Sequence, residues 1–195
     1  MKNIYFVRHG ECELNLLKVF AGRSDSPLTL LGREQSHTAA DDILNKQLKI
    51  DKIVSSSLWR ASETARIIAN DIGYPDTEIQ TSNLFVERSF GTLEGTPRTE
   101  CFDAYSYEDI DNAPGAESIE QLHDRAAQAY ELIKSLTKEN ILIVSHSAFF
   151  RAFKRAVDGN PFSHEYTSPF LTIKNGQVYI IEERIILTTL KQETI

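Results

Sequence analysis

Two histidines stand in the same position relative to apolar segments of the sequence. The apolar runs at residues 4–7 and 141–144 are typical of buried strands, and His9 and His146 each stand two positions after the end of such a run. In open α/β sheets ligands bind beyond the carboxyl ends of strands. Either histidine alone is equally well explained as a partly buried structural residue. Their parallel placement instead predicts that both imidazoles face one ligand.

Cationic and small residues close to these histidines indicate that the ligand is an anion. Arg8 directly precedes the first histidine, and its fork of N–H donors suits phosphate oxygens. Arg60 follows a short strand and opens a helix, where the helix dipole also favours an anion. By itself, Arg60 would be read as a solvated residue that pairs with Glu63. Gly10 allows a close backbone approach, and Asn15 adds a side-chain N–H donor.

The remaining segments predict the framework that positions these side chains. Further strands are expected at 52–54 and 77–81, and a hairpin around 174–176 is expected to join strands at 170–173 and 177–181. Apolar periodicity and a capping box predict helices at 29–48, 58–72, 118–137 and 148–157. Strands that alternate with helices predict a three-layer α/β/α sandwich with a mostly parallel mixed sheet. We expect one domain over residues 1–195, with an irregular, lid-like excursion at about 82–116.

Composition limits the classes of protein to which the chain can belong. The 195 residues carry a net charge of −7, which argues against non-specific binding to nucleic acid or to an anionic membrane. The two cysteines, Cys12 and Cys101, are too few for a disulfide framework or a zinc site. The sequence shows neither a signal peptide nor an apolar stretch long enough to span a bilayer. We therefore expect a cytoplasmic protein with reduced thiols, and the sequence leaves open whether it forms a homodimer.

The chain resembles the histidine phosphatase superfamily in its phosphoglycerate-mutase-like branch. The resemblance rests on six ordered blocks that cover most of the sequence. They are Arg8-His9-Gly10-Glu11 with Asn15; Gly22-Arg23, Asp25, Pro27-Leu28-Thr29 and Gly32; Ser55-Ser56 through Arg60-Ala61 with Thr64-Ala65; Leu84, Glu87, Phe90-Gly91 and Glu94-Gly95; Pro114-Gly115 with Glu117-Ser118; and Val144-Ser145-His146.

The resemblance implies a mechanism and a role for each matching residue. His9 attacks phosphorus and becomes phosphohistidine, while its other ring nitrogen carries the proton, bonded to a backbone carbonyl. Glu87, protonated when the substrate is bound, gives its proton to the leaving alkoxide and then takes one from the attacking water. No metal and no cofactor are required. The equatorial oxygens are held by Arg8, Arg60, His146 and Asn15, and the substrate is further contacted by Gly10 and Arg23. Ser147 is added to these contacts from its place beside His146 and not from the resemblance.

Several residues depart from the family pattern or match nothing catalytic. Ser147-Ala148 stands where relatives commonly have two glycines, so Ser147 is expected to narrow the pocket or to offer a hydroxyl. Cys12 is better explained as a packed thiol than as a redox switch. The remaining histidines and the aromatic residues nearby are assigned to surface or packing roles: His37, His123 and His164 to either, and Trp59, Phe149 and Phe150 to the core.

Three functions compete, and a phosphatase acting on a small-molecule phosphate ester is preferred. Mutases of the family have a long basic insert between the acid and the second histidine, whereas residues 89–116 here carry six acids and one base, Arg98. Such a lid suits a monoester with a neutral or aromatic body. A phosphoglycerate-type mutase is the first alternative. A non-catalytic phosphate-binding module is the second, and it is disfavoured because the nucleophile, the arginines and the acid are all present.

Overall fold

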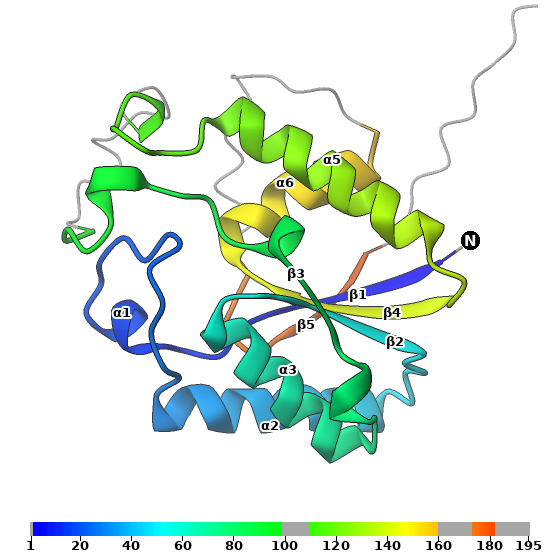
Figure 1. Ribbon diagram of the computed structural model, residues 1–195. Coiled ribbons are helices and arrows are strands. Elements are labelled where there is room, and N and C mark those ends of the chain that lie inside the picture. The colour runs from blue at the N-terminus through cyan, green and yellow to red at the C-terminus, as the bar shows by residue number, and fades with distance from the viewer. Residues whose placement is uncertain (1, 99–109, 160–172, 182–195) are drawn as a thin grey trace, which may run out of the picture.

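The fold is built on a five-stranded mixed sheet in the order β3-β2-β4-β1-β5 (Figure 1). The computed structural model describes residues 2–98, 110–159 and 173–181. Four strands are parallel, and the edge strand β5 runs antiparallel to β1. The mostly parallel mixed sheet that the sequence predicts is therefore confirmed. The strands are β1 (Asn3–Arg8), β2 (Lys52–Ser56), β3 (Gln80–Ser82), β4 (Asn140–Ser145) and β5 (Val178–Ile181).

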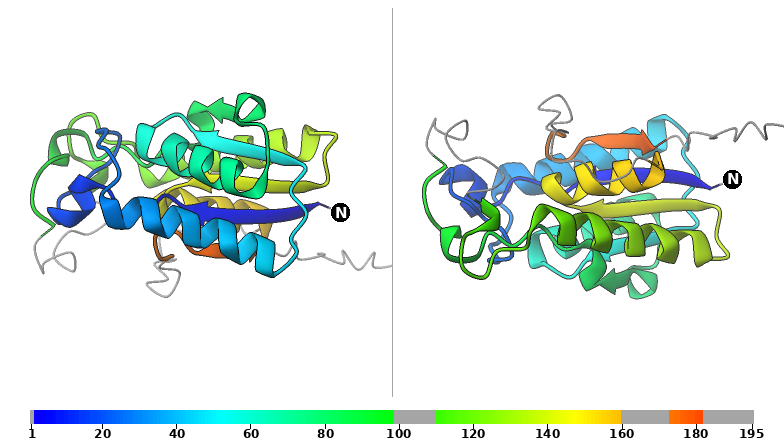
Figure 2. Two further views of the ribbon diagram at one scale, coloured as in Figure 1. Left: turned by 90° about the horizontal axis from the view of Figure 1, so that it is seen from below. Right: turned by 90° about the horizontal axis from the view of Figure 1, so that it is seen from above.

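Helices cover both faces of the sheet, which gives the three layers that the sequence predicts (Figure 2). The helices α2 (Leu30–Asn45) and α3 (Trp59–Ile72) lie on one face. The opposite face is covered by α5 (Ile119–Ser135) and α6 (Ser147–Val157). The described residues also form a short helix α1 (Glu13–Leu16) and three 3₁₀ turns, η1 (Asp76–Glu78), η2 (Asn83–Phe85) and η3 (Gly91–Leu93).

The strands at the centre of the sheet have apolar residues at consecutive positions because both of their faces are buried. In β1, Ile4 and Phe6 point to the α5 and α6 side, whereas Tyr5 and Val7 point to the α2 and α3 side. Each such side chain contributes about 1.5–3 kcal/mol when it is fully removed from water. The centre of the sheet is therefore closely packed, and it holds in place the residues that follow the carboxyl ends of its strands.

The ends of α3 and α5 show how local sequence sets the element bounds. Ser118 caps α5 by accepting from the backbone N–H of Gln121, and the Gln121 side chain bonds back to the Ser118 N–H, as the capping-box pattern predicts. Helix α3 ends at Gly73, whose φ of +73° allows the left-handed turn. The second strand of the predicted hairpin is β5, while residues 170–172 lie outside the described residues.

One packing prediction is wrong. Trp59 is 58% exposed and does not belong to the core. The buried stripe of α3 runs through Ala61, Ala65 and Ile68, and a residue two positions before Ala61 points about 200° away from it. Phe149 and Phe150 are buried, as predicted. The apolar residues at the ends of α2 are exposed, since its buried face is formed by Gly32, Ser36, Ala39, Ala40 and Ile43.

The described part of the predicted excursion, residues 82–98 and 110–116, lies beyond the carboxyl edge of the sheet (Figure 1). The ring of Phe90 packs against Phe20, with 5.1 Å between centroids. In the part of the chain that the structure describes, no helix combines the length and the apolarity that a membrane span requires.

Candidate active site

The register of β1 and β4 brings the two histidines together. Arg8 lies opposite Ser145 in this parallel pair, so the next residues, His9 and His146, leave neighbouring strands at the same level. The His9 backbone N–H donates to the Ser145 carbonyl at 2.9 Å. The two imidazole rings are buried, and their centroids are 5.0 Å apart. The predicted convergence of these rings is therefore present in the structure.

The ring of His9 is held in one tautomer. Its Nδ1 lies 2.6 Å from the Gly10 carbonyl oxygen, which can only accept, so Nδ1 carries the proton. On the other side of the ring, Arg60 Nε–H donates to Nε2 across 3.3 Å. Nε2 therefore keeps its lone pair, and that lone pair faces a guanidinium group.

The ring of His146 is oriented by Ser56 at the end of β2. His146 Nε2 lies 2.8 Å from Ser56 Oγ, and the same oxygen accepts from the Leu58 backbone N–H. Because Ser56 Oγ already accepts a hydrogen bond, we take its hydroxyl to donate to His146 Nε2. Nε2 is then unprotonated, and the proton of the neutral ring is on Nδ1. This Nδ1 is buried and has no hydrogen-bond partner among the described residues. It is a buried donor that an anion would satisfy.

Arg60 is the most buried cation of the site, with 1% of its surface exposed. Its Nη1 donates to the Ser24 carbonyl at 2.8 Å and its Nη2 to the Gly22 carbonyl at 2.7 Å. The solvated reading of Arg60 does not apply, because Glu63 pairs with Arg33 instead. Neutral carbonyl partners fix the guanidinium group, and its Nη1 also forms an ion pair with Asp25 Oδ1 at 3.8 Å.

Arg8 adds a second guanidinium group at the end of β1. Its Nη1 donates to the Ile173 carbonyl at 3.0 Å, and its buried Nε has no partner within the described ranges. Burial lowers the pKa of Arg8, and the nearby Glu87 carboxylate opposes that effect. The site therefore has unused donors on both Arg8 and His146.

The same surroundings keep both imidazoles neutral. Burial, followed by the positive charges of Arg60 and Arg8, holds the pKa of His9 well below its usual value, although the Gly10 carbonyl acts in the opposite direction. Burial and the charge of Arg60 lower the pKa of His146 in the same way, with a smaller effect from His9. A neutral imidazole is the form in which a histidine can act as a nucleophile.

The Glu87 carboxyl group lies at the N-terminus of α6, the helix that begins directly after His146. Its Oε2 accepts from the Ala148 N–H at 3.1 Å, and its Oε1 accepts from the N–H groups of Phe149 and Arg88 at 3.0 and 2.9 Å. Carboxylates are favoured at this end of a helix by its dipole and its unsatisfied N–H groups. The carboxyl group is thus fixed relative to the second histidine.

The other predicted contact residues lie around this cluster. Asn15 accepts from the Cys12 N–H through Oδ1, and Ser147 Oγ accepts from Arg151. Gly10 donates its N–H to Thr64 Oγ1. A Cβ on Gly10 would lie 2.1 Å from the Gly32 carbonyl oxygen, so this glycine is required by chain packing.

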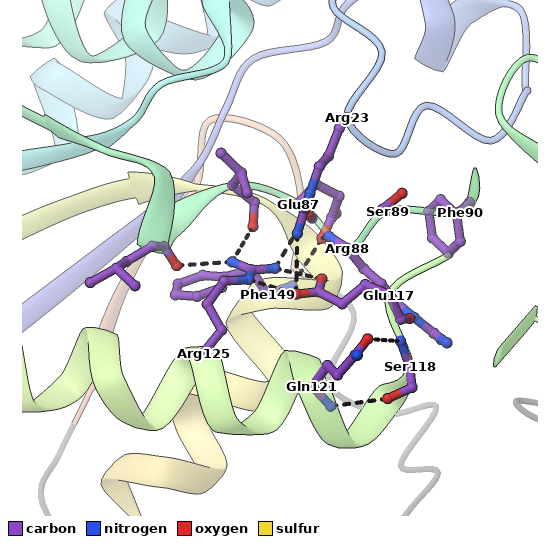
Figure 3. Close-up of polar contacts among 12 residues, drawn as sticks. Arg23, Glu87, Arg88, Ser89, Phe90, Glu117, Ser118, Gln121, Arg125 and Phe149 are labelled. Atoms are coloured by element: carbon purple, nitrogen blue, oxygen red, sulfur yellow. Dashed lines mark hydrogen bonds and ion pairs between the residues drawn. The ribbon is translucent and has the colours of Figure 1, made fainter. Parts of the chain in front are cut away.

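Arg23 and Glu94 connect the loop after β1 to the described part of the excursion. Arg23 donates from Nε to the Glu87 carbonyl and pairs through Nη2 with Glu117 (Figure 3). Glu94 accepts from the backbone of Arg23, Ser24 and Phe90 and from the Ser24 hydroxyl. Burial raises the pKa of Glu94, but these hydrogen bonds outweigh it and leave the pKa below its usual value.

The comparisons with known proteins agree with this geometry. The family model of the histidine phosphatase superfamily (branch 1) matches residues 4–185. The chain belongs to this superfamily. A 2,3-bisphosphoglycerate-dependent phosphoglycerate mutase from Parvibaculum lavamentivorans is 30% identical, over 80% of this chain and 79% of its own. The uncharacterized phosphatase PhoE from Bacillus subtilis is 32% identical, over 82% and 79%.

A solved structure gives the same result for this histidine phosphatase fold. It is a mutant phosphoserine phosphatase from Entamoeba histolytica in complex with phosphoserine, and it is 28% identical with a TM-score of 0.71. The alignment covers 91% of this chain and 89% of that one. The predictions of the family, of the fold and of a phosphatase as the class of enzyme are confirmed by these matches.

Some structural features of the histidine phosphatase site were not predicted from the sequence. Ser56 orients His146, Thr64 holds the loop at Gly10, and the carbonyls of residues 22 and 24 hold Arg60. The serines and Thr64 are within the matching blocks, but their partners are distant in sequence. Cys12 is buried, as expected of a packed thiol.

The acidic residues of the excursion are only partly described. Glu94 is used in the hydrogen bonds given above, and Asp111 pairs with Arg88. Glu100, Asp103, Glu108 and Asp109 lie outside the described residues, as do Cys101, His164 and residues 184–195. Within residues 2–98, 110–159 and 173–181, no three His, Cys, Asp or Glu side chains are grouped so that they could hold a metal ion.

Proposed function

We propose that this enzyme hydrolyses small phosphate monoesters through a phosphohistidine intermediate at His9. The observation that carries the proposal is the state of the His9 ring: Nδ1 is bonded to the Gly10 carbonyl at 2.6 Å, and Nε2 keeps its lone pair beside Arg60. A nucleophile needs this arrangement, in which one nitrogen holds the proton and the other is directed at the reacting atom. The burial and the two guanidinium groups that lower the pKa of His9 keep it in this neutral form.

The reaction proceeds in two steps. In the first, the lone pair of His9 Nε2 forms a bond to phosphorus while the bond from phosphorus to the ester oxygen breaks, and Glu87, protonated when the substrate is bound, gives its proton to the departing oxygen. In the second, a water attacks the phosphohistidine, Glu87 takes one of its protons, and the bond from phosphorus to Nε2 breaks. Inorganic phosphate is released, and both residues return to their starting states.

The unpaired donors of the site are suited to the phosphoryl oxygens. Arg8 Nε and His146 Nδ1 are buried and have no partner among the described residues. Arg60 lies against His9, and the amide nitrogen of Asn15 is the end of its side chain not used by Cys12. Donors that are fixed before the substrate binds stabilise developing charge without the cost of reorganisation. We assign the backbone of Gly10 and the side chains of Arg23 and Ser147 to the surroundings of the leaving group.

The preferred substrate is a monoester with a neutral or aromatic body. The support for this assignment is the charge of residues 89–116, with six acids against one base. We infer that the negative charge of this segment disfavours a second anionic group on the substrate. We therefore expect the rate of hydrolysis to fall as further anionic groups are added to the substrate.

Trapping the intermediate tests the proposal directly. The enzyme is mixed with an aryl phosphate, quenched at alkaline pH and digested, and the peptide that contains residue 9 is examined by mass spectrometry for an added phosphoryl group. We expect the modification at His9 and its absence in His9→Ala. His123→Ala provides a matched histidine control outside the site and should still be labelled. A modification elsewhere, or full turnover by His9→Ala, would refute the proposal.

The same assay examines metal dependence. Because imidazole, guanidinium and carboxyl side chains provide all of the chemistry in this scheme, turnover of the aryl phosphate should survive an excess of chelator. Loss of turnover that is restored by added divalent cation would contradict it. Three further statements stay predictions. They are that the protein binds neither nucleic acid nor membranes, that it is cytoplasmic, and that it can form a homodimer.

A phosphoglycerate-type mutase is the second candidate. It is favoured by the 30% identity to a 2,3-bisphosphoglycerate-dependent phosphoglycerate mutase. The two activities differ in product: a mutase converts 3-phosphoglycerate into its 2-phospho isomer when a bisphosphate primer is present, whereas a phosphatase releases inorganic phosphate. Isomer formation faster than phosphate release would assign the mutase activity instead.

A further inference from the structure

A guanidinium group on α5 is bonded to the segment that carries Glu87. Arg125 directs Nη1 to the carbonyls of Leu84 and Val86 at 2.9 and 2.8 Å, and Nη2 to the Glu87 carbonyl at 3.4 Å (Figure 3). Its Nε and Nη2 also donate to the two carboxylate oxygens of Glu117, both at 2.7 Å. Arginine has five N–H donors, and each of the five has an acceptor here.

Three of these acceptors belong to a segment without regular structure. Residues 84–87 start in the 3₁₀ turn η2 and then continue as an extended segment outside the named strands, so its carbonyls have no ladder partners of the usual kind. Buried carbonyl groups need donors, and a fork of fixed geometry sets the positions of several at once. The hydrogen bonds from Arg125 therefore define the path of the backbone up to Glu87.

The same guanidinium group also contacts the helix against which Glu87 is held. Its Cζ lies 5.4 Å from the centroid of the Phe149 ring, and the Phe149 backbone N–H donates to Glu87 Oε1 at 3.0 Å. Arg125 is thus shared between the two segments whose relative position sets the carboxyl group. A change of about 1 Å in that position is enough to impair proton transfer.

The charge of the group is balanced by Glu117, which is 8% exposed. Glu117 also accepts from Arg23 Nη2 at 3.1 Å, so the buried carboxylate lies between two guanidinium groups. Removal of one partner from such a buried pair leaves an uncompensated charge. A substitution at Arg125 must therefore be compared with a control that measures stability alone.

We propose that Arg125 is a positioning residue for proton transfer by Glu87. It fixes the backbone from which the carboxyl group reaches the leaving oxygen, and it does not take part in the attack by His9. This inference rests on the proposed function, in which Glu87 protonates the leaving group. It predicts that Arg125 affects substrates that need a proton and spares those that do not.

The test is a comparison of leaving groups in Arg125→Lys. Lysine keeps the charge but offers donors from one nitrogen only, so it cannot reach the carbonyls and Glu117 together. A simple alkyl phosphate releases a basic alkoxide that needs the proton, whereas 2,4-dinitrophenyl phosphate releases a stable anion. Because the later attack of water uses Glu87 with every substrate, the comparison is made in kcat/KM, which reports only the steps up to release of the leaving group. We expect kcat/KM for the alkyl phosphate to fall by about 10²-fold, the lower end of a general acid's effect, and kcat/KM for the dinitrophenyl ester to change by less than about threefold.

Two further variants make the result specific. Ile133→Ala removes a buried side chain from the same helix, two turns beyond Arg125, and should lower the Tm without changing the ratio of the two kcat/KM values. Glu117→Gln removes one charged arm of the same arrangement. If Arg125→Lys does not fold, this variant should show the same leaving-group selectivity, with a smaller fall in kcat/KM for the alkyl phosphate.

The outcomes separate this inference from the proposed function. Glu87→Gln is expected to show the leaving-group selectivity by itself, and Arg125→Lys should add little in the double variant. If Glu87→Gln lowers both kcat/KM values equally, the acid role of Glu87 is wrong and the positioning role is wrong with it. If Glu87→Gln is selective but Arg125→Lys and Glu117→Gln behave like Ile133→Ala, only the positioning role of Arg125 is overturned.

Discussion

Arg60 Nε lies 3.3 Å from His9 Nε2, and this contact joins an anion-binding group to the nitrogen that we propose as the nucleophile. The contact keeps Nε2 unprotonated, because a guanidinium N–H can only donate. It also places positive charge beside the point where phosphorus would be attacked. One side chain therefore contributes both to the neutral state of the His9 ring and to the positive charge around the reaction.

Replacement of Arg60 by lysine should separate charge from geometry. Arg60→Lys keeps the positive charge but loses the fork that reaches the carbonyls of Gly22 and Ser24. We expect kcat for an aryl phosphate to fall by about 10²–10³-fold, as it does when one fixed donor to a developing charge is lost. Steady-state kinetics measures this effect.

The control for that variant is Arg33→Lys on α2. Arg33 pairs with Glu63 at 2.9 Å and is 44% exposed, so its loss removes a surface ion pair of small energy. Its kcat should match that of the native enzyme. Equal activity of Arg60→Lys and the native enzyme would show that the guanidinium geometry is not needed.

The lowered pKa values of His9 and His146 predict a dependence of stability on pH. In the unfolded chain these imidazoles take up protons near pH 6.5, whereas in the folded state burial and the charge of Arg60 keep them neutral. Below pH 6.5 the unfolded state therefore binds more protons than the folded state. The free energy of unfolding should be highest above pH 6.5 and should fall between pH 6.5 and 5.

Urea titrations at several pH values measure this dependence. A variant that carries both His9→Asn and His146→Asn provides the comparison, because it lacks the two groups concerned. Its free energy of unfolding should change less with pH over the same range, whatever its absolute stability. Identical slopes for the native chain and the double variant would mean that the two imidazoles do not contribute.

The sequence was enough to predict that the residues after the strands form the site, but not which residues form hydrogen bonds with them. His9 and His146 converge because each directly follows a strand, and the pairing of Arg8 with Ser145 sets them level. The role of Ser56 depends on a contact across 90 positions of the sequence. Similarly, the Gly22 and Ser24 carbonyls that hold Arg60 come from a loop whose path no periodicity predicts. Such partners are set by tertiary packing.

Gly32 offers a test of how tightly the loop after β1 packs on α2. In an open helical position, Gly to Ala is stabilising by about 1 kcal/mol. Here a Cβ on Gly32 would lie 2.0 Å from the Glu11 carbonyl oxygen, so the loop that carries His9 would have to move. Gly32→Ala should therefore lower the free energy of unfolding by about 1–3 kcal/mol, as overpacking does.

Thr38→Ala serves as the control for Gly32→Ala, because Thr38 is exposed on the same helix. It should raise the free energy of unfolding by about 0.5 kcal/mol, as helix propensity predicts. Both values come from urea denaturation. An unchanged or increased stability of Gly32→Ala would show that the loop at Glu11 yields without cost.

Ser56 gives the last prediction, since its hydroxyl sets the tautomer of His146. Ser56→Ala leaves the buried Nε2 of His146 without its partner, and the proton is then free to move from Nδ1 to Nε2. A donor to the phosphoryl group would become an acceptor. We expect a loss of about 1–3 kcal/mol in transition-state stabilisation, or about 5- to 150-fold in kcat/KM for an aryl phosphate.

Ser55→Ala is the matched control, because Ser55 is equally buried on the same strand and donates to the Ser56 carbonyl at 3.0 Å. Side chains of successive strand residues point to opposite faces, so this change leaves His146 oriented. Nitrogen chemical shifts of His146 should report a proton on Nδ1 in the native chain and in Ser55→Ala, and a mixture of tautomers in Ser56→Ala. Equal losses of kcat/KM in the two serine variants, with the His146 shifts unchanged in both, would mean that strand packing and not the tautomer limits the reaction.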